Sequence, residues 1–127
     1  MLFRSSGSWL ARLDGAGAAH TDTLAQTVTI PAGCAKASLS FWLDIATNDP
    51  ATAASDTFKV QVLSTSGTVL ATLKTLSNLN ATGGYTRHSY SLTRFIGQRV
   101  TIKFTGKETL AGHNTSFFDD DNALNVS

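Results

Sequence analysis

The chain has 127 residues, 15% of them charged, and its formal net charge at pH 7 is +1. This length suits one domain, which can bury roughly two-thirds of the surface that the unfolded chain exposes. The charge balance argues against binding to nucleic acid or to an anionic membrane, because the ten Lys and Arg residues are dispersed along the chain. No apolar run approaches the ~20 residues that a membrane span requires. A single cysteine, Cys34, cannot form an internal disulfide, so stability must come from the hydrophobic core.

The first half of the chain alternates apolar and polar residues, the pattern of strands with one buried face. Three segments show it: Ser8–Asp14, Thr21–Ile30 and Lys36–Ile45. In the second segment, inward positions are predicted for Leu24, Val28 and Ile30. The third segment is the clearest strand, and its inward residues are Leu39, Phe41, Leu43 and Ile45. Its outward residues are Ser38, Ser40, Trp42 and Asp44.

The second half continues as strands separated by turns and polar loops. The predicted strands are Thr57–Leu63, Thr68–Thr75, Gly84–Leu92, Val100–Phe104 and Phe117–Val126. The predicted connections are Ala46–Ser55, the hairpin turn Ser64–Gly67, Ser77–Gly84 and Lys107–Thr115. The run Ser89–Phe104 turns a corner at Phe95 and Ile96, which would join two strands across a sandwich. With about eight to nine short strands and no helical period, the sequence predicts an all-β, antiparallel β-sandwich of two sheets. We find no internal repeat or linker, so residues 1–127 are expected to form one domain.

Two segments near the carboxyl end resemble a known fold. Ser91–Phe104 resembles the dLsxyaGqxvxlxF run of jelly-roll modules, a fold shared by many carbohydrate-binding modules and MAM-like adhesion domains. Phe118–Leu124, which includes Asp120-Asp121, is similar to their closing FxxDDxxL strand. The resemblance implies a jelly-roll β-sandwich. Asp119 departs from the pattern, because this position of the closing strand is usually apolar.

Four further segments resemble a narrower group, the β-sandwich that follows the catalytic domain in secreted bacterial serine-carboxyl peptidases of the sedolisin (kumamolisin-like) type. They are Trp9–Gly17, His20–Leu24, Gln26–Val28 and Leu39–Leu43. The resemblance implies a non-catalytic accessory domain that is exported and attached to a hydrolase, with the parent peptidase domain as a partner. The sedolisin catalytic Ser, Glu and Asp lie in a domain that this sequence does not contain. The first residues also lack the basic and then apolar pattern of a signal peptide. We therefore interpret the chain as one domain of a larger secreted protein.

The run Asp119–Asn122 is the most acidic segment of the chain. In a regular strand, Asp119 and Asp121 would point one way, and Asp120 and Asn122 the other. Calcium prefers oxygen ligands from carboxylates and backbone carbonyls, and the resemblance implies a structural Ca²⁺ near this strand. Asp120 and Asp121 are the candidate ligands. Alternatively, these carboxylates bind loop amides or water. Thermal melting with and without a chelator distinguishes the two.

Trp42 is the leading candidate for a binding residue, because it occupies an outward position between Ser40 and Asp44. An exposed indole ring can stack on the apolar face of a sugar, with polar groups beside it. Tyr85, Arg87 and His88 would supply such groups if their strand lies nearby. The alternative is that Trp42 is covered by the loop Ala46–Ser55 or by a neighbouring domain.

Catalytic motifs are missing from the sequence. A Gly-x-Ser-x-Gly elbow is absent, and Glu108 is the single glutamate, in a predicted loop without an obvious second carboxylate. The three histidines, His20, His88 and His113, lack metal-ligand spacing. We therefore predict a non-enzymatic accessory module that binds a polysaccharide or other glycan. The alternative is a structural or protein-interaction domain that packs on the peptidase or holds its protein substrate.

Overall fold

The computed structural model describes residues 11–14, 20–47, 56–81, 83–108 and 115–127, and for residues 11–14, 20 and 120–122 it describes the backbone alone. These residues form eight strands: β1 (Ala11–Asp14), β2 (His20–Thr29), β3 (Ala37–Thr47), β4 (Thr57–Leu63), β5 (Val69–Ser77), β6 (Thr86–Ser91), β7 (Arg99–Glu108) and β8 (Thr115–Val126). Two short 3-10 helices, η1 (Asn78–Asn80) and η2 (Thr93–Phe95), complete the described elements. No helix in these ranges is long and apolar enough to cross a membrane.

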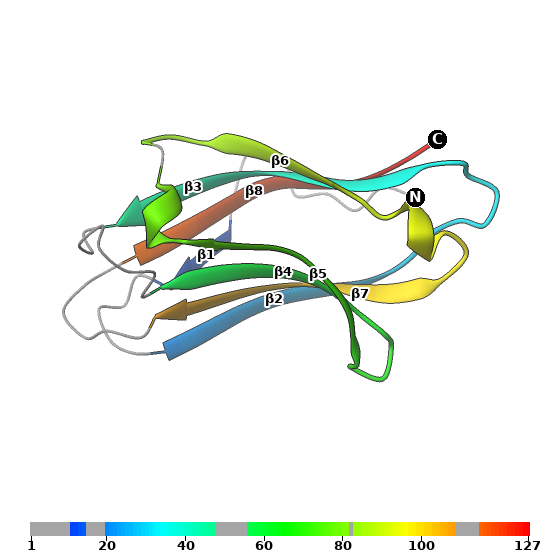
Figure 1. The fold of residues 1–127 in the computed structure, drawn as a ribbon, viewed down its shortest axis with the longest axis horizontal. Coiled ribbons are helices and arrows are strands. Elements are labelled where there is room, and N and C mark those ends of the chain that lie inside the picture. Colours follow the sequence, from blue (N-terminus) through cyan, green and yellow to red (C-terminus); the bar gives the residue numbers. More distant parts are fainter. Residues whose placement is uncertain (1–10, 15–19, 48–55, 82, 109–114) are drawn as a thin grey trace.

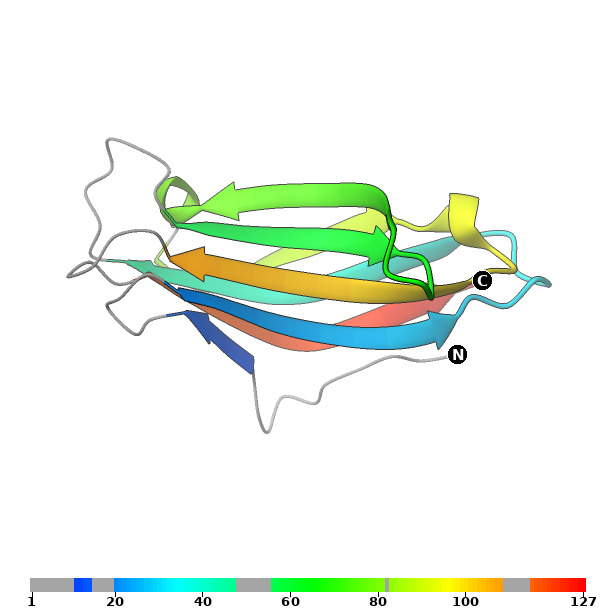
Figure 2. The same cartoon turned by 90° about the horizontal axis from the view of Figure 1, so that it is seen from below.

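The strands form two four-stranded sheets that pack face to face (Figures 1 and 2). Sheet A has the order β1-β8-β3-β6, and sheet B has the order β2-β7-β4-β5. Every neighbouring pair is antiparallel. The predicted all-β, antiparallel jelly-roll β-sandwich is therefore confirmed.

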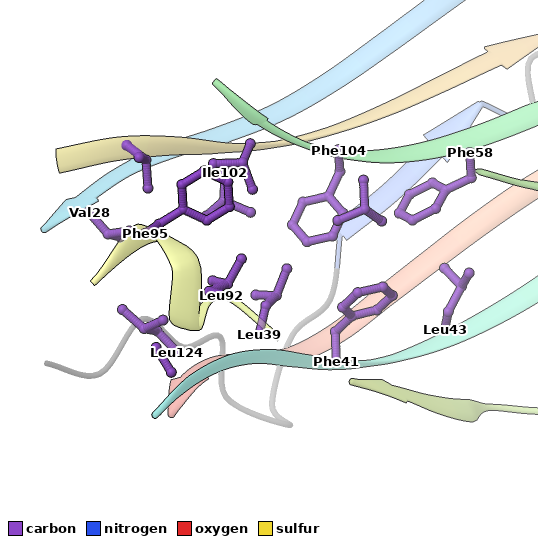
Figure 3. Close-up of a cluster of buried hydrophobic side chains, with 14 of the residues drawn as sticks. Val28, Leu39, Phe41, Leu43, Phe58, Leu92, Phe95, Ile102, Phe104 and Leu124 are labelled. Atoms are coloured by element: carbon purple, nitrogen blue, oxygen red, sulfur yellow. The ribbon is translucent and has the colours of Figure 1, made fainter. Parts of the chain in front are cut away.

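Aromatic rings from both sheets form the centre of the core (Figure 3). The ring centroids of Phe41 in sheet A and Phe104 in sheet B are 5.2 Å apart, in an edge-to-face arrangement. Phe58 stacks on Phe104 at 5.6 Å and on Phe117 at 5.3 Å. Offset and edge-to-face pairs are favourable because the positive edge of one ring meets the negative face of another. The two sheets are thus held together by contacts that reach across the sandwich.

The inward and outward positions of β3 follow the predicted alternation. The four residues predicted to face inward are all buried: Leu39, Phe41, Leu43 and Ile45. In β2 Val28 is buried as predicted, and Leu24 shares its inward phase because it pairs with the buried Phe104, but Leu24 is 36% exposed. Strand β2 lies at the edge of sheet B, where an inward side chain has no further strand of its own sheet to cover it.

The predicted corner is confirmed, since β6 belongs to sheet A, β7 belongs to sheet B, and η2 connects them. Phe95 is buried and anchors this turn in the core. The amide of Gly97 donates to the carbonyl of Ile30 at 2.8 Å, and the amide of Ile30 donates to the carbonyl of Gln98 at 2.9 Å. Gly97 has φ +83°, a left-handed conformation that favours glycine because it has no Cβ.

Strand β8 contains an irregularity that the sequence pattern did not predict. Ser40 of β3 pairs with Ala123, whereas Trp42 pairs with Asp120. Between these two pairs the chain advances three residues along β8 but only two along β3, so β8 holds one extra residue. Such an extra residue shifts the side-chain phase of the strand. As a result Asp119 and Leu124, five residues apart, are both buried. The prediction that side chains alternate regularly through Asp119–Asn122 is therefore wrong.

Candidate functional site

Trp42 lies on the outer face of sheet A, in the centre of the long strand β3. Its neighbours Phe41 and Leu43 are buried, while the Trp42 side chain is 40% exposed. Successive residues of a strand point to opposite faces, so burial of the two neighbours in the core directs the indole ring outward. This confirms the outward position predicted for Trp42.

Arg87 is the direct neighbour of Trp42 on the next strand. The register pairs Trp42 of β3 with Arg87 of β6, and the Arg87 side chain is exposed. Side chains that stand directly opposite each other in an antiparallel pair have Cβ atoms about 5 Å apart. The guanidinium group is thus within reach of the indole ring, and an Arg beside a Trp can lie against it while keeping donors free for a ligand.

A polar groove lies on the same face, near the start of β3 and separate from Trp42. It has a volume of about 390 Å³, and its lining includes Ser38 of β3, Ser89 and Ser91 of β6, and Asn125 of β8. Ser38 pairs with Ser91 and with Asn125. The Nδ2 of Asn125 donates to Ser40 Oγ at 2.9 Å, which fixes the orientation of this amide. Along β3, Ser38 is four residues from Trp42, a distance of about 13 Å.

The sequence prediction missed this groove, although a signal for it was present. Serines recur at alternate positions on β3 (Ser38, Ser40) and on β6 (Ser89, Ser91). The register that places these two pairs side by side is a tertiary property, because β3 and β6 are separated by two strands of the other sheet.

Tyr85 is exposed and immediately precedes β6. It is two residues from Arg87, so in extended backbone it belongs to the same face of sheet A. By this spacing Tyr85 shares its phase with Arg87 and with Ser89 and Ser91 of β6. Trp42, Arg87 and Tyr85 are three of the four residues predicted to bind a ligand.

His88, the fourth predicted residue, points to the opposite side of the sheet. Its ring stacks on Phe41 with centroids 5.3 Å apart, and its Nδ1 lies 3.0 Å from the Tyr90 hydroxyl. It also lines a small, mainly apolar pocket of about 190 Å³ together with Leu43, Ile45, Leu76, Asn80 and Thr86. The structure therefore does not bring His88 together with Trp42.

Partial burial shifts the pKa values of His88 and Tyr90. Burial lowers the pKa of His88 below its ordinary value of 6.5, and the positive charge of Lys74 lowers it further. Burial also raises the pKa of the Tyr90 hydroxyl. Both groups are therefore neutral at pH 7, as is expected for side chains packed against Phe41.

We expect His88 to make stability depend on pH. Its pKa is lower in the folded than in the unfolded protein, so between these two values the unfolded chain binds more protons and unfolding becomes easier as the pH falls. The Tm should therefore decrease from about pH 7.5 to about pH 5, and the decrease should be smaller in His88→Gln. Carboxylates titrate in both proteins, so the difference between the two Tm profiles isolates His88. Identical profiles would contradict the prediction.

The acidic residues with described side chains do not form a metal site. No group of three His, Cys, Asp or Glu side chains among them is arranged to hold an ion. The side chains of Asp120 and Asp121 lie outside the described residues, so calcium binding by this pair stays a prediction. Glu108, predicted to lie in a loop, instead ends β7 and is buried, and its Oε1 accepts a hydrogen bond from the Thr115 amide at 3.0 Å. This contact joins the ends of β7 and β8.

Comparison with known proteins relates the chain to solved structures through its fold. No protein-family model matches the chain, and no curated protein matches it in sequence. The structure of TmCBM61 in complex with beta-1,4-galactotriose is similar, with a TM-score of 0.65 and 14% identity over 96% of this chain and 73% of that one. A chain of infectious bursal disease virus, Gt strain, has a TM-score of 0.53 and 13% identity over 98% of this chain and 31% of the viral one. At these identities the likeness establishes a shared β-sandwich fold.

Proposed function

We propose that this domain binds carbohydrate on the outer face of sheet A and catalyses no reaction. The observation that carries the proposal is the exposed Trp42, which stands beside Arg87 on the face of sheet A that also carries the polar groove. Exposure of a large aromatic ring in the middle of a sheet face costs hydrophobic free energy unless a ligand or partner covers it. A sugar ring suits this surface, because it presents an apolar face and a rim of hydroxyl groups.

Each part of the surface has a different task in this proposal. The indole ring of Trp42 stacks on one sugar ring, and Arg87 donates hydrogen bonds to hydroxyl groups of the same or the next ring. The hydroxyl groups of Ser38 and Ser91 and the amide of Asn125 then contact units further along the chain. The surface from Trp42 to Ser38 spans about 13 Å, with donors and acceptors on neighbouring strands, and this length accommodates several sugar units of an extended polymer.

The ligand to test first is β-1,4-galactan. The similar module TmCBM61 was solved with a β-1,4-linked galactotriose, and the groove described above is lined mostly by uncharged polar groups. A neutral polysaccharide therefore fits the chemistry of this face better than a charged one.

We further propose that the domain is the accessory module of an exported bacterial hydrolase of the sedolisin type. The support is the resemblance of Trp9–Gly17, His20–Leu24 and Leu39–Leu43 to that group. In such an arrangement the bound polysaccharide raises the effective concentration of substrate near the catalytic domain. Co-purification with a sedolisin catalytic domain tests the association.

Binding to insoluble polysaccharides tests the carbohydrate proposal directly. The protein should be retained by β-1,4-galactan and eluted by soluble galacto-oligosaccharides, with weaker retention by cellulose, xylan and chitin. Elution by the soluble sugar is the control against non-specific adsorption. Failure to be retained by any of these neutral polymers would overturn the proposal and favour the protein-interaction alternative.

A further inference from the structure

The outer face of sheet B, which is the nearer layer in Figure 2, gathers positive charges that are scattered in the sequence. Strand β7 presents Arg99, Lys103 and Lys107 outward, because the alternate residues Val100, Ile102 and Phe104 are buried. Strand β4 adds Lys59, which pairs with Thr105. We call this surface, from Arg99 to Lys107 on β7 with its outward neighbours on β2 and β4, the lysine–threonine face.

Within the described part of the chain, this face carries no negative charge. Among the described residues, the outward positions of β2, β4, β5 and β7 hold no carboxylate. The acidic residues of sheet B point inward instead: Glu108 is buried, and Asp22 of β2 pairs with the buried Gly106. The net charge of the whole chain is small, but in sheet B the basic side chains of β4 and β7 point outward and the acidic ones of β2 and β7 point inward.

Hydroxyl groups alternate with the cations. Thr101 and Thr105 lie between the charged residues of β7, and Thr21, Thr23, Thr27 and Thr29 flank them on β2. Thr27 and Thr101 share a hydrogen bond of 2.9 Å between their Oγ1 atoms. On the other side, Gln61 Nε2 donates to Thr72 Oγ1 at 3.2 Å. These side-chain contacts between strands hold the polar groups in regular rows.

The spacing suits an extended, repeating anion. Lys103 and Lys107 are four residues apart on one strand, which separates their Cα atoms by about 13 Å. Lys59 stands one strand away and halfway between them, about 8 Å from each. The three cations therefore form a shallow triangle, and among the described residues no carboxylate shares their outward phase in sheet B.

We infer that the lysine–threonine face binds an acidic polysaccharide such as a polyuronate. The carboxylates of such a polymer pair with Lys59, Lys103 and Lys107, and its hydroxyl groups bond to the intervening Thr and Gln side chains. This site is on the opposite side of the sandwich from Trp42, so it stands independently of the neutral-glycan site proposed above.

The chemistry of the face disfavours other anionic partners. Its outward positions contain no aromatic ring for stacking on nucleic-acid bases, and the sequence pI of about 7.9 gives a weak overall field. A membrane-binding surface would combine cations with exposed large apolar side chains, whereas Thr fills most positions between the Lys residues here. Repeated hydroxyl and carboxylate groups on one ligand match the alternation of Thr and Lys.

Polygalacturonate is the test ligand, and its fully methyl-esterified form is the matched neutral control. Calorimetric titration should show binding to the first and little to the second. Lys59→Gln/Lys103→Gln should weaken the binding roughly tenfold, since each exposed ion pair contributes up to about 1 kcal/mol. Lys74→Gln/Arg94→Gln removes the same charge from positions outside this face and should change it less than about twofold. About 1 M NaCl should abolish it, because the screening length falls to about 3 Å.

Several outcomes would overturn the inference. Equal binding to the esterified polymer would show that charge is not used, and an equal loss in the two double variants would show that this face is not the site. Stronger binding to duplex DNA or to anionic phospholipid vesicles than to polygalacturonate would assign the face to another partner. Galactan retention should be unchanged in Lys59→Gln/Lys103→Gln, which keeps this test separate from that of the Trp42 site.

Discussion

Phe41→Ala should destabilise the domain by about 3–5 kcal/mol, a large part of the total stability expected for a domain of this size. Phe41 is fully buried and contacts rings of both sheets, with Phe104 at 5.2 Å and Phe58 at 6.3 Å between centroids. It also stacks on His88 of its own sheet. Truncation to alanine removes the transfer free energy of the ring and leaves a cavity between sheets that cannot close completely.

Urea denaturation measures this loss as a lower transition midpoint at unchanged slope. Leu79→Ala is the control, because the Leu79 side chain is 47% exposed and its truncation should cost no more than about 0.5 kcal/mol. If Phe41→Ala does not fold, Phe41→Leu retains most of the volume and should cost about 1–2 kcal/mol. A cost below 1 kcal/mol for the alanine variant would contradict the position of Phe41 between the sheets.

The fold was predictable where burial on one face controls the residue pattern. From Ala37 to Ala46 of β3 each inward residue is apolar and each outward residue is small or polar apart from Trp42, so the period of two determines which face is buried. The pattern failed where an element is irregular or at an edge. Leu24 is exposed because β2 ends sheet B, and Asp119 is buried because an extra residue in β8 shifts the phase. Neither cause is local to the sequence around these residues.

The candidate site was predictable in part for the same reason. The outward phase of Trp42 follows from β3 alone, but its pairing with Arg87 depends on the order of strands in sheet A. Arg87 and His88 are consecutive residues of one strand, so they face opposite sides and cannot both lie beside Trp42. Strand alternation alone was therefore sufficient to predict that only one of Arg87 and His88 could lie beside Trp42.

Strand order also explains why the charge pattern was not visible in the sequence. Lys59 and Lys103 are 44 residues apart in the printed sequence, yet β4 and β7 are neighbours and Lys103 pairs with Gln61, two residues from Lys59. In the sequence alone, the dispersed Lys and Arg residues argued against a charged binding surface. Folding nevertheless placed them on one face, because the outward positions of β7 recur at every second residue.

Trp42→Ala should weaken binding to β-1,4-galactan roughly 30-fold or more, the effect of losing a hot-spot residue worth about 2 kcal/mol. The ring supplies most of the apolar contact area on a surface whose other groups are serine hydroxyls, an amide and the Arg87 guanidinium. Hydrogen bonds from such groups exchange with water at small net gain, so they orient a sugar more than they hold it. Trp42→Phe should keep part of the affinity, since a smaller ring still stacks.

Stability and binding must be measured on the same preparations, because a folding defect would also abolish retention. The Trp42 side chain is 40% exposed, so its truncation should cost about 1–2 kcal/mol and leave a cooperative unfolding transition. Leu79→Ala has an exposed apolar side chain of comparable accessibility and should bind galactan as the unsubstituted protein does. Should Trp42→Ala fold cooperatively and bind within about twofold of the unsubstituted protein, the sugar would have to lie elsewhere on the sandwich. That outcome would favour the protein-interaction alternative for the face that carries Trp42.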